Sequence, residues 1–248
     1  MIFFLFAFYA SYAIGQIPAQ EKQILEPYIG KIEESFSYLE ANLEKEQATY
    51  QEILKECKRL EKEIEKDPSF FTKSKLKLQL EIEKYRVEKL EKKIQEKKLQ
   101  LAIYTCLLWG FQKSIINLDK LQKAKTMKRE IIQHQIWARQ ERYKAKERWE
   151  NADKRVAEIA RERIESEQKL QEYKKRLEVL EYKKSWSNIK ERLELGTGIA
   201  LQNSKIIALD AERIVQEKIQ KDSVAEEKSM FLEETEATAA LRVIASNM

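Results

Sequence analysis

The chain has 248 residues and a formal net charge of +5; 36% of its residues are charged and 43% are hydrophobic, but only five are glycine and three are proline. So few turn-forming residues exclude sandwiches, barrels, Rossmann-type folds and collagen. Because the hydrophobic residues recur with a regular period, disorder is also disfavoured. The composition predicts an all-α protein: an elongated antiparallel coiled-coil or helical bundle of about four long helices.

The charge is unevenly distributed along the chain. Residues 21–67 hold 8 basic and 13 acidic side chains, whereas residues 68–150 hold 21 basic and 10 acidic ones. Opposite charges in successive segments favour helices that lie against each other.

The N-terminal segment resembles an export signal in its composition. Residues 1–20 contain no charged side chain, and residues 2–10 are wholly apolar. Small residues follow at 11–13 (SYA) and 13–15 (AIG), the pattern that a signal peptidase needs. We therefore expect a signal peptide over 1–15 and a secreted or extracytoplasmic protein, periplasmic or extracellular. The alternative is a membrane anchor that extends to about residue 20, because about 20 residues can span a bilayer.

Residues 21–110 predict an antiparallel coiled-coil hairpin. The spacing of the first helix alternates between three and four, and Pro68 ends this helix because proline cannot donate a backbone hydrogen bond. Phe70 and Phe71 are expected to pack at the hairpin tip, and Ser69 or Thr72 to cap the second helix. The predicted seam positions are Ile29, Ile32, Phe36, Leu39, Leu43, Glu46, Tyr50, Ile53, Cys57, Leu60 and Ile64, then Leu76, Leu80, Glu83, Val87, Leu90, Ile94, Lys97, Leu101, Tyr104 and Leu108.

Residues 111–248 predict a long spine helix and a C-terminal helix that form one continuous rod with the hairpin. A break is expected near Gly110, as a turn or a kink, and the spine helix is expected from about Phe111 to Leu195. Gly196-Thr197-Gly198 is expected to end it, with a fourth helix from about Ile199. The seam of the spine is predicted at Trp149, Ala152, Val156, Ile159, Arg163, Ser166, Leu170, Tyr173, Leu177 and Leu180, and a weaker apolar face of the fourth helix at Ile206, Leu209, Ile214 and Val215.

The two cysteines, Cys57 and Cys106, lie too far apart along the predicted hairpin for a disulfide between them, since bonded cysteines need Cα atoms within about 7 Å. We predict that both are free, or that they pair between chains.

Residues for catalysis are sparse. His134 is the only histidine, and no glycine-rich phosphate-binding pattern follows a predicted strand. The sequence therefore predicts a protein that is not an enzyme and has no cofactor or metal site.

Two segments depart from the coiled-coil pattern. Residues 120–148 hold ten basic and three acidic side chains, a composition that suits pairing with the acidic first helix, a protein partner or an anionic membrane surface, and less so nucleic acid. Residues 101–111 (LAIYTCLLWGF) form an uncharged run that is either buried where helices converge or exposed as an apolar tip. The candidate interaction or lipid-contact residues are Lys120, Lys123, Lys125, Lys128, Arg129, Arg139, Arg142, Lys144, Trp109 and Phe111.

The leading functional prediction is an exported, non-enzymatic structural or interaction protein that acts by helix–helix pairing with protein partners or with itself. The alternative is a peripheral membrane-active protein that docks through the basic segment 120–148, with the apolar tip 101–111 inserted in the lipid.

Overall fold

The computed structural model describes residues 17–66, 69–112, 114–182 and 188–247, and these contain helices and no strand. The all-α prediction is thereby confirmed. The expected signal peptide at 1–15 lies outside the described residues, and of the alternative anchor to about residue 20 only residues 17–20 are described. The chain divides into two compact units: residues 1–138 with 232–248 form unit 1, and residues 139–231 form unit 2. The elements are α2 (Ala19–Leu25), the 3-10 helix η1 (Glu26–Tyr28), α3 (Ile29–Glu65), α4 (Phe70–Gly110), α5 (Leu118–Thr126), α6 (Lys128–Tyr182) and α7 (Ile189–Ser246).

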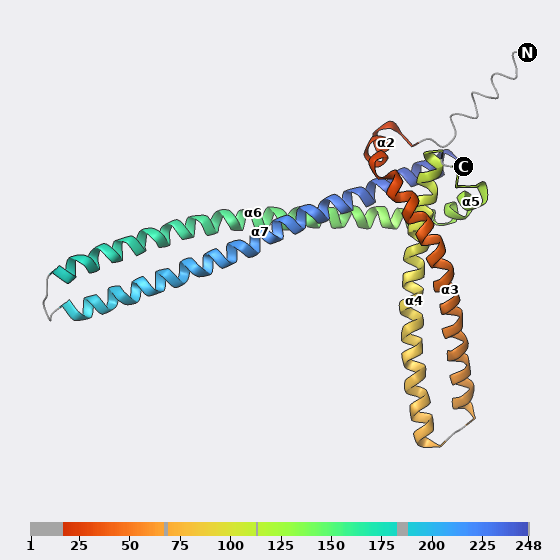
Figure 1. Cartoon of the computed structure of the whole chain (residues 1–248), viewed down its shortest axis with the longest axis horizontal. Coiled ribbons are helices and arrows are strands. Elements are labelled where there is room, and N and C mark those ends of the chain that lie inside the picture. Colours follow the sequence, from red (N-terminus) through yellow and green to blue (C-terminus); the bar gives the residue numbers. More distant parts are fainter. Residues whose placement is uncertain (1–16, 67–68, 113, 183–187, 248) are drawn as a thin grey trace, which may run out of the picture. The chain divides into compact units, whose positions relative to one another are not determined.

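Helices α3 and α4 of unit 1 form the expected antiparallel hairpin (Figure 1). Every seam position predicted for these two helices is buried or partly buried. Toward the tip of the hairpin, a small cluster of Ile53, Cys57, Leu60 and Leu80 is separate from the main core of the unit. The heptad pattern therefore predicted the packed face of both helices correctly.

The polar seam position Glu46 is held by two lysines of α4. Its carboxylate lies 2.8 Å from both Lys93 Nζ and Lys97 Nζ, and Lys97 is itself a predicted seam residue. Lys84 pairs with Glu61 nearer the tip. The acidic first helix thus pairs with the basic second helix, as the charge distribution predicts.

The start of α4 differs in part from expectation. Ser69 is the N-cap residue, but its hydroxyl lies 2.9 Å from the Thr72 hydroxyl and makes no side-chain cap to the backbone. Phe70 and Phe71 contact each other edge to face and are both largely exposed. The prediction that they pack the hairpin tip is wrong, because the first turn of α4 directs them to solvent.

The main core of unit 1 surrounds the last turns of α4. Residues 102–108 are all buried there, together with side chains from α2, α3, α5, the first turn of α6 and the last turns of α7. This is the arrangement expected where several helices converge. The fully or almost fully buried members include Leu25, Leu107, Leu108, Leu121, Ile131, Val243 and Ile244.

Gly110 ends α4, which confirms a break at this residue. A Cβ atom there would lie 2.6 Å from Ile17 Cγ1 and 2.9 Å from Val243 Cγ2, so glycine allows a close approach of neighbouring side chains. The positive φ of 57° that turns the chain falls two residues later, on Gln112.

The helix expected from Phe111 to Leu195 is not continuous. Helix α5 begins after Asn117, whose side chain accepts a hydrogen bond of 2.9 Å from the Lys120 backbone N–H. It ends at Thr126, and α6 starts at Lys128. The expectation of one helix is wrong because it overlooked an N-cap asparagine with Asp119 in the first turn, which is a helix-start signal.

In unit 2, α6 and α7 lie side by side as an antiparallel hairpin (Figure 1). Of the predicted α6 seam, every position except Trp149 is buried or partly buried. Small side chains fill much of it, since Ala145, Ala152 and Ser166 are almost fully buried at heptad spacing. Arg155 forms a two-pronged ion pair with Glu212, with atoms 2.7 and 3.0 Å apart, and Arg163 pairs with Asp210 at 2.8 Å.

The predicted helix end at Gly196-Thr197-Gly198 is wrong, because α7 runs through all three residues. Thr197 Oγ1 donates to the Leu193 carbonyl within the helix, and a Cβ on Gly198 would lie 2.9 Å from the Tyr173 ring. Glycine inside a helix costs about 1 kcal/mol relative to alanine, which the packing along a helix of this length outweighs.

Candidate interaction surfaces

The basic segment 120–148 belongs to both units. Lys120, Lys123 and Lys125 lie on α5 and Lys128 and Arg129 on the first turn of α6, all in unit 1, whereas Arg139, Arg142 and Lys144 lie in unit 2. Only the first group can therefore be described as one local surface.

Most of these cations contact groups of the same chain. Lys120 Nζ lies 2.7 Å from Glu40 Oε1 of α3 and 5.1 Å from the centroid of the Phe36 ring. Lys125 donates to the Asn247 carbonyl at 2.7 Å. In unit 2, Arg142 lies over the Phe231 ring and Lys144 pairs with Glu141. Among these contacts, the Lys120–Glu40 ion pair joins the basic segment to the acidic first helix.

The two candidate aromatic residues are partly buried. Trp109 and Phe111 both pack against the main core of unit 1, and Lys22 Nζ lies 5.7 Å from the centroid of the Phe111 ring. The run 101–111 is thus packed at the end of α4, with residues 102–108 buried.

Unit 1 has a groove between α3, α4 and α5 with a volume of about 380 Å³. Leu101, Ala102 and Met127 supply apolar lining, while Lys98, Lys120, Lys123 and Glu40 supply charge. Lys120 and Lys123 were expected at an interaction surface from their sequence pattern, whereas Lys98, on the neighbouring helix α4, was not.

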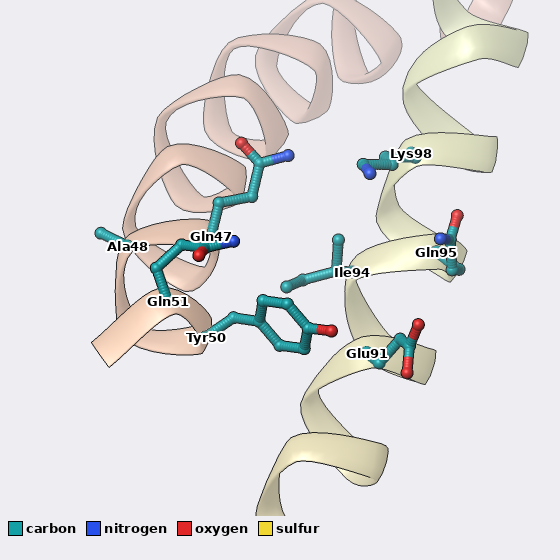
Figure 2. A pocket seen from close by; sticks show the side chains of 8 residues that line it. All are labelled: Gln47, Ala48, Tyr50, Gln51, Glu91, Ile94, Gln95 and Lys98. Atoms are coloured by element: carbon teal, nitrogen blue, oxygen red, sulfur yellow. The ribbon is translucent and has the colours of Figure 1, made fainter. Parts of the chain in front are cut away.

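A second pocket, of about 540 Å³, lies in the α3–α4 hairpin (Figure 2). Tyr50 and Ile94 point toward each other across it, and Gln47, Gln51 and Gln95 surround them (Figure 2). The three glutamines flank the seam positions Tyr50 and Ile94, so this pocket lies beside the coiled-coil seam.

A cluster of titratable side chains lies where α4, α6 and α7 meet in unit 1. His134 Nε2 is 3.4 Å from Glu233 Oε2, and Gln100 Nε2 donates to the buried Tyr104 hydroxyl at 3.1 Å. Burial lowers the pKa of His134 and raises that of Glu233. Burial, with a smaller contribution from Glu233, raises the pKa of Glu236 to about 7. Apart from the single histidine, no sequence pattern pointed to this cluster.

Both cysteines are buried free thiols, Cys57 in the tip cluster of the hairpin and Cys106 in the main core. Burial raises the pKa of Cys106 to about 12 and also raises that of Cys57. Neither thiol is therefore activated as a nucleophile. Among the described residues, no group of three or more potential metal ligands occurs.

The outward side of α7 in unit 2 carries a run of exposed apolar side chains. The exposed fractions are 72% for Leu193, 65% for Leu201, 70% for Ile207, 68% for Ile214 and 55% for Val215. We call this surface the outer face of α7. The prediction that Ile206, Leu209, Ile214 and Val215 share one apolar face is wrong, because Leu209 is buried and Ile214 and Val215 are exposed.

Helix geometry explains the two faces. At about 100° per residue, Ile207 and Leu209 point to nearly opposite sides of α7. The seam with α6 contains Leu195, Leu209 and Ser223, which are buried at multiples of seven. A second heptad series, displaced by two residues, places Leu193, Ala200, Ile207 and Ile214 on the solvent side.

No protein-family model, curated protein or solved structure matches this chain. Within the described parts of the chain, none of the helices combines the length and the apolar character needed to cross a bilayer.

Proposed function

We propose that this protein is an exported, non-enzymatic structural or interaction protein that acts by pairing a helix with a helix of another polypeptide. The observation that carries the proposal is the outer face of α7: five large aliphatic side chains, each more than half exposed, on a helix whose other side is already packed. Contiguous apolar surface of this kind on a folded protein is typical of an interaction site.

The pattern of the outer face suits a helix as partner. Leu193, Ile207 and Ile214 belong to one heptad series, and Leu201 and Val215 belong to a second series beside it, so a second helix can meet the face along its length. From Leu193 to Val215 the face is about 33 Å long. A partner helix of some three heptads would cover it.

Membrane docking is less well supported than helix pairing. The window 193–215 contains Lys205 and Arg213 but also three acidic residues, whereas helices that bind anionic lipid carry a surplus of lysine and arginine. In unit 1, residues 102–108 of the run that would insert as an apolar tip are buried. We therefore do not extend the proposal to a lipid surface.

The proposal is tested by measuring whether the outer face is covered where the protein acts. Leu201→Cys places a thiol in the face, and Ser229→Cys places one at an exposed position of α7 outside it. Labelling with a water-soluble maleimide is compared between the native source and dilute purified protein. We expect position 201 to be protected at least tenfold in the native source and position 229 to be equally reactive in both. Equal labelling of position 201 in both would overturn the proposal.

Export is tested separately by N-terminal sequencing of the protein from its native source. A mature chain that starts near Ile14 or Gln16 is expected. A chain that still begins at Met1 would contradict cleavage and point to a retained anchor.

A further inference from the structure

We infer that the partner of the outer face of α7 is a second copy of this chain, bound antiparallel about a two-fold axis at Ser204. The inference rests on the proposed function, because it names the partner for the same surface. Three features of the described residues of unit 2 carry it: the symmetry of the face, its area and the disposition of the charges around it.

The outer face is symmetric about its centre. The middle of the face holds three small residues on successive helical turns, Ala200, Ser204 and Ala208. Four of the five large residues are placed at equal distances on either side, with Leu193 and Leu201 toward the start of α7 and Ile207 and Val215 toward its end, whereas the position that matches Ile214 is Glu194. A two-fold axis through Ser204 sets Leu193 of one copy opposite Val215 of the other, and Leu201 opposite Ile207.

Such a face is complementary to itself, which is the requirement for a dimer with two-fold symmetry. The small central row lets the two helix axes approach closely at the crossing point, and the large side chains interlock on both sides of it. A parallel pair in register would instead place large residues against identical large residues and small against small, and would leave a gap at the centre.

The surface area is sufficient for a specific but moderate association. Burial of the five large side chains removes on the order of 400 Å² of apolar surface per copy, if each contributes roughly 80 Å². With the small residues and the flanking side-chain stems, a pair buries on the order of 1,200 Å² in total. This lies at the lower limit of stable specific interfaces.

The charges nearby leave the face free for an apolar contact. Asp210 and Glu212 turn toward α6 and bind Arg163 and Arg155, and Arg213 pairs with Glu217 along α7. On the helix, no charged side chain falls between the two apolar rows from 193 to 215. A second copy therefore buries the central residues Leu201 and Ile207 without stranding a charge, which would be costly.

Mixed cross-linking tests the antiparallel arrangement. Leu193→Cys and Val215→Cys are made in the full-length chain, purified separately, mixed and treated with a short bismaleimide. We expect a covalent dimer at least tenfold more abundant in the mixture than in either protein alone. As matched controls, a mixture of Leu193→Cys with Ser229→Cys and the wild type, whose two native cysteines are buried, should give no more than the background.

A second measurement does not depend on cysteine chemistry. The wild type should sediment as a monomer–dimer equilibrium between 1 and 50 µM, and Ile207→Glu should raise the dissociation constant at least tenfold without a change in helical circular dichroism. Cross-linking that is as strong within either single variant as in the mixture would overturn the antiparallel arrangement. A wild type that remains monomeric at 50 µM would overturn the second copy as partner, while protection of position 201 in the native source would still support helix pairing with a different chain.

Discussion

At the scale of single residues, Glu236 is the carboxyl group whose protonation state bears most directly on stability. It is largely buried in unit 1 near Glu233, and its pKa is raised to about 7. In the unfolded chain a glutamate titrates near 4.3. Between these two values the folded state binds more protons than the unfolded state, so the free energy of unfolding falls as the pH rises from about 4.5 to 7.

Glu236→Gln is therefore expected to stabilise the protein at pH 8 by about 1–3 kcal/mol and to change the stability little at pH 4. The neutral amide retains the shape of the protonated acid and has no charge to desolvate. Urea unfolding of both proteins at pH 4, 6 and 8 measures the difference, with Glu130→Gln, an exposed position of the same unit, as the control. A gain of the same size at pH 4 and pH 8 would contradict the assignment.

Replacement of glycine by alanine is expected to change the stability in opposite directions at two positions of unit 1. Gly110→Ala puts a Cβ within 3 Å of Ile17 and Val243 and is expected to destabilise the protein by about 1–3 kcal/mol. Gly30→Ala meets nothing within 4 Å in the first turn of α3 and is expected to stabilise it by up to about 1 kcal/mol. Thermal unfolding followed by circular dichroism compares the two variants. A stabilising Gly110→Ala would show that the neighbouring side chains move aside at little cost.

At the scale of the element, Glu46 and Lys97 form the polar layer of the α3–α4 seam. Both side chains are less than one-fifth exposed, and two lysine contacts outweigh burial in lowering the pKa of Glu46. A double-mutant cycle with Glu46→Ala and Lys97→Ala is expected to give a coupling energy of about 1 kcal/mol. The exposed pair Glu88 and Lys92 on α4, also 2.8 Å apart, should give a clearly smaller coupling energy. Equal coupling energies for the two pairs would mean that a position in the seam does not strengthen an ion pair.

The same elements show how far a single sequence determines this fold. In α3 and α4 the heptad spacing predicted the packed positions, polar ones included, because a two-helix seam leaves one face per helix to be buried. In α7 the prediction assigned residues of two different apolar faces to one face. Leu209 and Ile214 both fit a hydrophobic pattern, and only the position of α6 decides which of the two side chains is buried. The break expected at Gly196 failed because α6 instead ends at Tyr182, before six residues without glycine or proline.

The candidate surfaces were predicted less well than the helices, for a physical reason. The titratable cluster joins Tyr104, His134 and Glu236 from three helices, and the sequence spacing within one helix carries no information on such contacts. The basic segment was recognised from composition, but composition does not reveal that Lys120 meets Glu40 or that Lys125 meets the backbone of Asn247. Tertiary contacts of this kind decide which charges remain available.

At the scale of the whole molecule, the two units have separate sources of stability. Unit 1 has a compact core of large apolar side chains from several helices, whereas unit 2 is a two-helix hairpin with many small residues and ion pairs in its seam. A two-helix seam buries less apolar surface per residue than a core built from several helices. Unit 2 should therefore unfold at a lower temperature than unit 1.

Two substitutions at fully buried positions can assign the transitions. Leu107→Ala lies in the core of unit 1 and Ile159→Ala in the seam of unit 2, and each is expected to remove about 2–4 kcal/mol. In differential scanning calorimetry, Ile159→Ala should lower the first transition by several degrees and leave the second within about 1 °C, and Leu107→Ala should do the reverse. Helices α6 and α7 contribute residues to both units, and their continuity favours unfolding of the two units in one transition. A single transition that both substitutions shift alike would show that the helices transmit unfolding from one unit to the other.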